Sequence, residues 1–249
     1  MEPKYFNDYS MFETKHWWFI GRRRILKCLL LRFLKKKTTN FLDIGCGSGK
    51  WIKKWAEKQA VFGVDMYLPI LKECKSSGLK RVTQGVLQCM PLKNDSFGCI
   101  TLLDVLEHID DEDLALEEVK RVAKPDAIVM LTVPAFSFLW GSQDLVSHHK
   151  RRYTVKDIIS LMQKHGFAVM KVSCFNTILF PIIFVIRTYR LMKRGETKEL
   201  DKINSDFEIN KGDIINTFLS VIFSLERFML PYVSLPLGVS IVCIAKVVK

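Results

Sequence analysis

The chain has 249 residues, of which 49% are hydrophobic and 26% are charged, and its formal net charge is +12. This composition is typical of a globular protein with a large core and excludes an intrinsically disordered chain. One domain, or one domain with an insertion, accounts for the length. The positive charge indicates an anionic partner, either nucleic acid or an anionic membrane surface, unless the chain is simply rich in lysine.

The seven cysteines are scattered and contain no C-x-x-C pair. This spacing argues against a disulfide framework and against a structural zinc site, so we expect free thiols, no bound metal and a reducing, cytoplasmic environment. The first eight residues include acids and lack an apolar run, so we expect no signal peptide.

The N-terminal region, residues 1–38, combines aromatic and basic side chains and leads into a helix that we expect to continue through Leu34. The helix has apolar residues at helical spacing, and a run of lysines follows it. The aromatic residues either pack this helix against the core or form part of a ligand site.

A short apolar run at 41–44 is followed by three glycines spaced one residue apart. A strand, a glycine turn and a helix in this order open a doubly wound α/β nucleotide-binding unit, where glycines let backbone N–H groups approach a ligand. A second apolar run, residues 60–64, ends in Asp65. This acid stands 20 residues after Gly45, where a ribose hydroxyl pair is expected to be held.

Further apolar runs predict strands at 80–85, 99–103, 128–133, 167–174 and 237–246. Helices are expected at 68–74, from Glu107 through Ala123, and at 155–165. Thr154 is the expected N-cap of the last helix, and Gly166 is expected to end it.

Residues 175–236 contain two apolar runs, which are separated by a basic and polar stretch. The first run is too short to span a bilayer, and Glu226 and Arg227 interrupt the second, so we expect no transmembrane helix. The two runs either lie as amphipathic helices on an anionic membrane surface or form a helical cap on the protein itself or on a second subunit.

Three motifs resemble those of the class I S-adenosylmethionine-dependent methyltransferases. The stretch 41–50, FLDIGCGSGK, is similar to the family's first motif, and 104–108, DVLEH, is similar to its motif after strand four. Residues 134–153, with the pattern P-A-x-x-x-L-W and a later H-x-R-R-Y, resemble the methyltransferase type 11/12-like subset.

The resemblance implies an α/β fold: a Rossmann-like, doubly wound, seven-stranded and mostly parallel sheet with helices on both faces. One methyltransferase domain is expected over 1–249. It would consist of a cap (1–38), a cofactor-binding core (39–174), a helical insertion or lid (175–236) and a final strand (237–249).

The implied cofactor is S-adenosylmethionine. The alternative is a nicotinamide cofactor such as NAD, but its G-x-G-x-x-G pattern would need a glycine where this chain has Lys50. Many relatives have an acid directly after Gly85, where this chain has Val86, so adenine recognition is expected from backbone groups of Val86 and Leu87. The residues that the resemblance places around the cofactor are Asp43, Gly45, Cys46, Gly47, Gly49, Asp65, Met66, Val86, Leu87, Asp104 and Val105.

Candidate general bases are His108 and His149, because histidine titrates near neutral pH. The alternative for His108 is an architectural role at a helix start. Basic residues after strand five could bind an anionic acceptor, or they could form a solvated face. The candidate substrate residues are Trp18, Arg22, Trp140, His148, Arg151, Arg152 and Tyr153.

The expected function is methyl transfer to a small acceptor that is lipophilic or linked to a lipid or glycan. The alternatives are an RNA methyltransferase and a non-catalytic S-adenosylmethionine-binding protein. Nucleic acid is the less favoured partner, because the sequence contains no recognisable RNA-binding module. Peripheral contact with the inner face of a membrane and a homodimer are further expectations.

Overall fold

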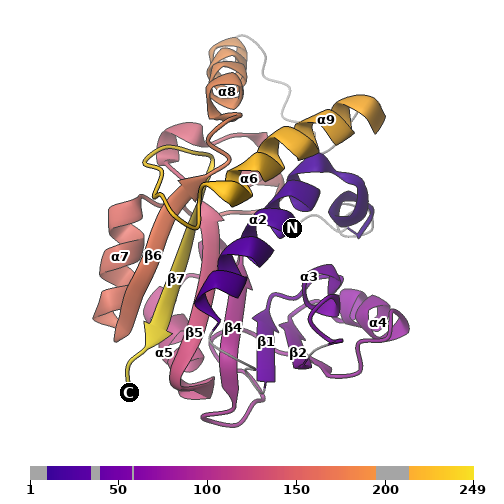
Figure 1. The fold of residues 1–249 in the computed structure, drawn as a ribbon, viewed down its shortest axis with the longest axis vertical. Coiled ribbons are helices and arrows are strands. Elements are labelled where there is room, and N and C mark those ends of the chain that lie inside the picture. Colours follow the sequence, from indigo (N-terminus) through magenta and orange to yellow (C-terminus); the bar gives the residue numbers. More distant parts are fainter. Residues whose placement is uncertain (1–9, 35–39, 58, 195–212) are drawn as a thin grey trace.

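The computed structural model describes residues 10–34, 40–57, 59–194 and 213–249. Seven strands form one sheet in the order β3-β2-β1-β4-β5-β7-β6, and β7 alone runs antiparallel to its neighbours. This arrangement confirms the expected Rossmann-like sheet (Figure 1). The strands are β1 (Asn40–Ile44), β2 (Ala60–Asp65), β3 (Val82–Gln84), β4 (Phe97–Leu103), β5 (Ala123–Pro134), β6 (Phe167–Phe175) and β7 (Ser240–Val247).

Helices cover both faces of the sheet (Figure 1). A short helical segment at 10–15 precedes the long helix α2. The α-helices with printed bounds are α2 (Trp17–Phe33), α3 (Lys50–Lys53), α4 (Leu68–Ser76), α5 (Glu112–Val122), α6 (Ser142–Val146), α7 (Val155–Lys164), α8 (Phe180–Arg194) and α9 (Asp213–Ser224).

Alternating side chains along the strands divide the core into two layers. Leu42 and Leu131 face the layer that α5 and α7 cover, whereas Phe41 and Met130 face the layer that α2 and α9 cover. All four side chains are almost completely buried. The central strands are apolar on both faces for this reason, and such runs are recognisable in the sequence.

The expected helix from Glu107 through Ala123 is wrong. A 3-10 turn, η1 (Leu106–His108), comes first, and α5 begins only at Glu112. The side chain of Asp111 accepts a hydrogen bond of 2.9 Å from the backbone N–H of Leu114, so Asp111 is the N-cap. Glu107 and His108 therefore lie in the loop after β4.

Other boundaries also differ from the expected ones. Strand β5 begins at Ala123 instead of Ile128. Ala123 pairs with Phe97 of β4, and the register shifts between Phe97 and Cys99. Strand β7 begins at Ser240 instead of Leu237. Thr154 caps α7 as expected and accepts a hydrogen bond of 3.2 Å from the N–H of Asp157.

Helices α8 and α9 lie between β6 and β7 in the chain, within the expected insertion. The Phe223 ring of α9 packs against α2, where a Cβ on Gly21 would collide with it. Trp17 contacts the same ring edge-on, at a centroid distance of 5.7 Å. One face of α9 is therefore part of the protein core.

A buried glutamate anchors the insertion to β6. Glu226 lies in the 3-10 turn η5 (Leu225–Phe228) and is 0% exposed. Its carboxylate accepts hydrogen bonds from three consecutive backbone N–H groups, those of Asn176, Thr177 and Ile178, at 2.6–2.9 Å. Burial raises the pKa of Glu226 above its ordinary value, and the three N–H groups oppose that rise.

No helix within the described ranges is long and apolar enough to cross a membrane. The basic run of the insertion lies within α8, whereas its polar stretch at 195–212 and the first nine residues of the chain lie outside those ranges.

Candidate functional site

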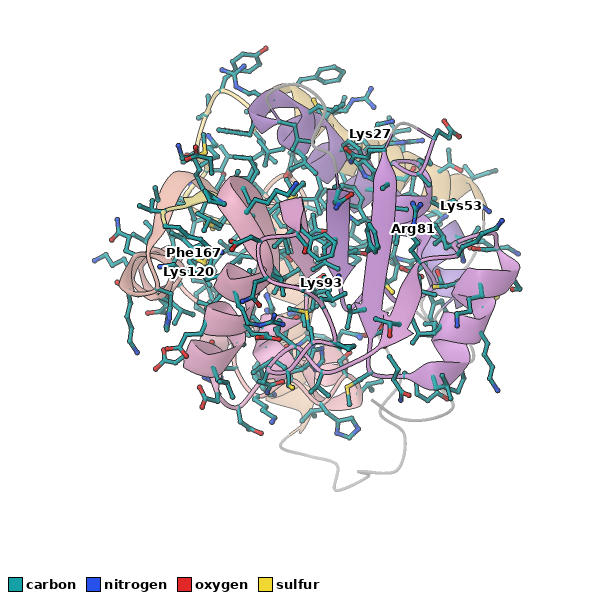
Figure 2. All side chains as sticks on the ribbon, turned by 90° about the horizontal axis from the view of Figure 1, so that it is seen from below. Lys27, Lys53, Arg81, Lys93, Lys120 and Phe167 are labelled. Carbon is teal, nitrogen blue, oxygen red and sulfur yellow. The ribbon has the colours of Figure 1, made fainter. Side chains whose placement is uncertain are left out.

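The carboxyl ends of the parallel strands meet at one edge of the sheet, and the loops that follow them form the candidate site (Figure 1). Ile44 at the end of β1 pairs with Val64 of β2 and with Leu102 of β4. The loops after these three strands are therefore neighbours. Figure 2 shows the opposite edge, where Arg81 and Lys93 precede β3 and β4 and Phe167 begins β6.

The three predicted glycines after β1 have left-handed backbone angles, with φ of +69° at Gly45, +52° at Gly47 and +77° at Gly49. Other residues adopt such angles at a cost. A Cβ on Gly45 would also lie 2.5 Å from Cγ2 of Val105, so the loops after β1 and β4 touch at this point. The glycines therefore permit a tight turn between two neighbouring loops.

Asp65, at the end of β2, holds the glycine loop. Its Oδ2 accepts a hydrogen bond of 2.9 Å from the N–H of Gly47, and its Oδ1 accepts one of 2.9 Å from the N–H of Tyr67. Burial raises the pKa of Asp65, which these backbone hydrogen bonds lower. Asp65, the acid expected to hold a ribose hydroxyl pair, thus lies in direct contact with the glycine loop.

One cysteine belongs to this loop and a second one contacts it. The thiol of Cys74 in α4 donates a hydrogen bond of 2.9 Å to the carbonyl of Gly47. The pKa of Cys46 is raised by its hydrogen bond with Cys74 and by burial. Cys46 is thus a buried thiol within the loop.

Apolar side chains next to Asp65 are uncovered. Met66 directly follows Asp65 and is 70% exposed, and Val86, beyond the paired residues Asp65 and Gln84, is 47% exposed. Leu87, by contrast, is buried. An exposed apolar surface suits the flat face of an adenine ring, and the neighbouring carboxylate of Asp65 suits a ribose hydroxyl pair, so these residues fit S-adenosylmethionine.

The acid within the first motif, Asp43, is buried and hydrogen-bonded. Its Oδ1 accepts a hydrogen bond of 2.5 Å from the hydroxyl of Thr101, which in turn accepts one of 3.2 Å from the indole N–H of Trp51. Burial raises the pKa of Asp43 well above its usual range. Asp43 therefore joins β1 to β4 beneath the loops.

Asp104 follows β4 with a left-handed backbone, φ +58°. Its Oδ1 accepts a hydrogen bond of 3.0 Å from the Thr132 hydroxyl, and its Oδ2 lies 2.5 Å from Nη1 of Arg22. The Arg22 guanidinium also lies 4.7 Å from the ring centroid of Trp18. The structure thus brings two predicted substrate residues, Trp18 and Arg22, to a predicted cofactor residue.

The N-terminal segment lies over the glycine loop. The Glu13 carboxylate accepts a hydrogen bond from the Ser48 hydroxyl, and Nζ of Lys50 donates one of 2.9 Å to the hydroxyl of Ser10. Burial raises the pKa of Glu13. No sequence pattern identifies Glu13 as part of the site, because its partner Ser48 lies 35 residues away in the chain.

Two histidines and a glutamate meet beside Asp104. The rings of His108 and His149 make an edge-on contact at 4.8 Å, and Nε2 of His149 lies 3.9 Å from Oε1 of Glu107. Burial and the neighbouring His149 lower the pKa of His108 to about 4. Burial, followed by the charge of Asp104, raises the pKa of Glu107 well above its usual range.

A fourth residue, Asp144 in α6, orients this cluster. It is 0% exposed, and its Oδ1 lies 2.9 Å from Nδ1 of His149. Arg152 donates to both of its oxygens at 2.9 Å and to the carbonyl of Ala135 at 2.8 Å. These contacts outweigh burial and lower the pKa of Asp144 to about 2.

The remaining predicted substrate residues after β5 divide into two groups. Arg151 donates a hydrogen bond of 2.7 Å to Glu112, and the Tyr153 hydroxyl donates to the same carboxylate. Arg151, Arg152 and Tyr153 therefore have partners inside the chain and stabilise the loop after β5. Trp140 is half-buried, and His148 is exposed with φ +55°.

A row of aromatic rings extends from the loop after β5 to α8. Phe136 stacks on Phe138 at 5.1 Å, Phe138 contacts Phe184 edge-on at 5.9 Å, and Phe184 stacks on Phe180 at 5.9 Å. Phe138 is 52% exposed and Phe184 is 41% exposed. The loop and the insertion thus share an apolar surface that is open to solvent.

Comparisons with known proteins agree with this arrangement. A family model described as a methyltransferase domain matches residues 18–172. Demethylmenaquinone methyltransferase of Staphylococcus aureus is 29% identical over 150 residues, which cover 54% of this chain and 59% of that protein. The chain thus spans little more than half the length of these curated relatives.

Two solved structures share the fold. An S-adenosylmethionine-dependent methyltransferase of Archaeoglobus fulgidus has a TM-score of 0.59 at 20% identity, covering 96% of this chain and 99% of the other. One of Thermotoga maritima has a TM-score of 0.58 at 16% identity, covering 97% of both chains.

Proposed function

The chain belongs to the S-adenosylmethionine-dependent methyltransferases, and we propose that it methylates a lipophilic acceptor at an anionic membrane surface. The observation that carries this proposal is the open aromatic row, which connects the loop beside the His108–His149 cluster with helix α8. An acceptor with an apolar body would lie along these rings and present its reacting atom to the loops after β4 and β5.

Different residues of the proposed cofactor site would bind different parts of S-adenosylmethionine. Asp65 would hold the ribose, and the exposed side chains of Met66 and Val86 would cover the adenine. The N–H groups of the glycine loop and Asp104 would face the methionine end, with Arg22 neutralising Asp104. The cofactor supplies an activated methyl group, and the protein aligns the acceptor with it and excludes water.

The outer surface of the insertion supports a membrane location. Helix α9 buries Phe223 against α2, yet Ile214, Phe218 and Val221 on the same helix are 86%, 63% and 49% exposed. A contiguous apolar surface of this kind on a chain with a net charge of +12 suits an anionic bilayer, in which apolar side chains enter the headgroup region. We propose that the insertion is the membrane-facing lid of a single methyltransferase domain.

The relative from Staphylococcus aureus supports the same acceptor class, since demethylmenaquinone is a lipophilic molecule. The likeness covers little more than half of each chain, so it favours a class of acceptor and not that compound in particular. An RNA acceptor has no comparable support in the described structure.

The test is a transfer assay with S-adenosylmethionine that carries a labelled methyl group. The purified chain is incubated with a membrane lipid extract, with demethylmenaquinone in anionic liposomes, or with total RNA. We expect label in the organic phase, and none with a Gly47→Ala variant. Label in the RNA alone would replace the proposed acceptor class, and no transfer to any fraction would contradict it.

A further inference from the structure

The cluster beside Asp104 has the composition of a metal site. Glu107, His108 and His149 each offer one ligand atom, and these atoms all lie within 4.8 Å of one another. They come from two separate loops, after β4 and after β5, which the sheet brings together.

The environment of Glu107 indicates that this cluster binds a ligand. Glu107 is 0% exposed, and neither of its carboxylate oxygens has a hydrogen-bond partner among the described residues. A buried carboxylate without donors is costly unless a proton or a cation lies against it. The two arginines whose charges act on Glu107 do not meet this need, because Arg22 pairs with Asp104 and Arg152 with Asp144.

Nε2 of His149 faces Glu107, and the contacts of Nδ1 favour the tautomer that leaves a lone pair on Nε2. Nδ1 faces Asp144, which accepts hydrogen bonds from Arg152 and from the N–H of Gly141 at 2.7 Å and is therefore a carboxylate. Nδ1 thus carries the proton, so Nε2 is free to act as a ligand. At 3.9 Å from Glu107, Nε2 is too far away for a hydrogen bond but close enough to share an ion.

We propose that Glu107, His108 and His149 bind a divalent transition-metal ion of the zinc class. Two imidazoles and one carboxylate are the ligands of catalytic zinc sites, which keep a further coordination position open. Asp144 would act as the outer carboxylate that orients a ligating histidine. The expectation of no bound metal considered cysteine spacing, and this site contains no cysteine.

The role of the ion rests on the proposed function. An acceptor hydroxyl bound at the open position would lose its proton to water more readily, because a metal ion lowers the pKa of a bound hydroxyl. The oxygen would then form a bond to the methyl carbon while the S–CH₃ bond breaks, and the electron pair of that bond remains on sulfur. The site therefore favours an oxygen acceptor.

The test is metal binding by the full chain, without any acceptor. After chelation and dialysis, the protein is titrated with Zn²⁺ by calorimetry and with Co²⁺ by visible absorption. We expect one equivalent of each, and cobalt bands without the near-ultraviolet charge transfer that a cysteine thiolate would give.

Three variants assign the site. Glu107→Gln keeps the shape of the side chain and should weaken Zn²⁺ binding at least tenfold, as should His149→Ala. His165→Ala is the matched control, because His165 follows α7 and contacts Asp113 instead of the cluster, and this variant should bind like the wild type.

Zn²⁺ binding that persists in both cluster variants would overturn the proposal. The absence of binding by the wild type would also overturn it and would indicate that Glu107 carries a proton instead. A titration of the same samples with S-adenosylmethionine reports separately on the proposed function. Metal binding without cofactor binding would therefore reject that function and keep the site.

Discussion

Nη1 of Arg22 lies 2.5 Å from Oδ2 of Asp104, and this ion pair joins the N-terminal helix α2 to the loop after β4. Both side chains are mostly buried, with exposures of 9% and 21%. Arg22 is also one of the cations that lower the pKa values of Asp43, Glu13 and Glu107 against the effect of burial. Arg22 thus partly compensates the negative charge of several buried acids around the glycine loop and the loop after β4.

We expect Arg22→Met to lower the free energy of unfolding by about 3 kcal/mol, because it leaves Asp104 as an uncompensated charge. Urea denaturation measures this loss. The double variant Arg22→Met/Asp104→Asn should recover part of the stability, since it removes the unpaired charge. Equal stability of the single variant and the wild type would show that the pair is not needed in the folded protein.

Gly47→Ala should abolish detectable S-adenosylmethionine binding, because it adds a side chain to the loop that approaches the cofactor. Gly78→Ala is the matched control. Gly78 also has a left-handed backbone, φ +98°, but a Cβ there would meet no atom within 4 Å. Both variants should lose about 1 kcal/mol of stability from backbone strain. Equal cofactor affinities in calorimetry would place the ligand elsewhere.

Asp65→Asn should weaken S-adenosylmethionine binding by about 1–3 kcal/mol, the loss of hydrogen bonds to a charged group. Burial raises the pKa of Asp65 above 3.8, so its negative charge is lost as the pH falls through that raised value. Wild-type affinity should therefore decrease over this acidic range, and the variant should lack the corresponding step. Calorimetry at several pH values measures both, with Asp126→Asn at the other edge of the sheet as the control.

Glu226→Gln should lower the free energy of unfolding by about 2 kcal/mol, because an amide offers one acceptor oxygen to three N–H groups and leaves buried donors unpaired. Thermal and urea denaturation measure the change. The exposed Glu117→Gln is the control and should have no effect. A similar result for the two variants would mean that Glu226 does not anchor the insertion.

The triple variant Ile214→Ser/Phe218→Ser/Val221→Ser should release the protein from anionic liposomes without lowering its melting temperature, because these side chains are exposed. Sedimentation with vesicles measures the bound fraction. Leu114→Ser, an exposed apolar residue on α5, should leave binding unchanged. Deletion of the insertion is a poorer test, because it would uncover the part of α2 that packs on Phe223.

The sheet was predictable because strands that are covered on both faces appear as short apolar runs, as with 41–44 and 128–133. The glycine loop and Asp65 were predictable because a fixed spacing relates them. The start of α5 was misplaced, although Asp111 and the acids after it carry the signal of an N-cap.

The partners of Arg151, Arg152 and Glu226 could not be predicted, because they lie at sequence separations that no local pattern encodes. Arg151 meets Glu112 over 39 residues, and Glu226 meets Asn176 over 50. Both arginines were interpreted as substrate contacts, and Glu226 only as an interruption of an apolar run. The separation of Glu107 from His149 likewise concealed their cluster.

The most direct test of the central claim is a calorimetric titration of the purified chain with S-adenosylmethionine and, separately, with NAD. Binding of S-adenosylmethionine in the micromolar range, together with no binding of NAD, is the predicted result. Binding of NAD alone, or of neither ligand, would contradict the cofactor site built from the glycine loop and Asp65.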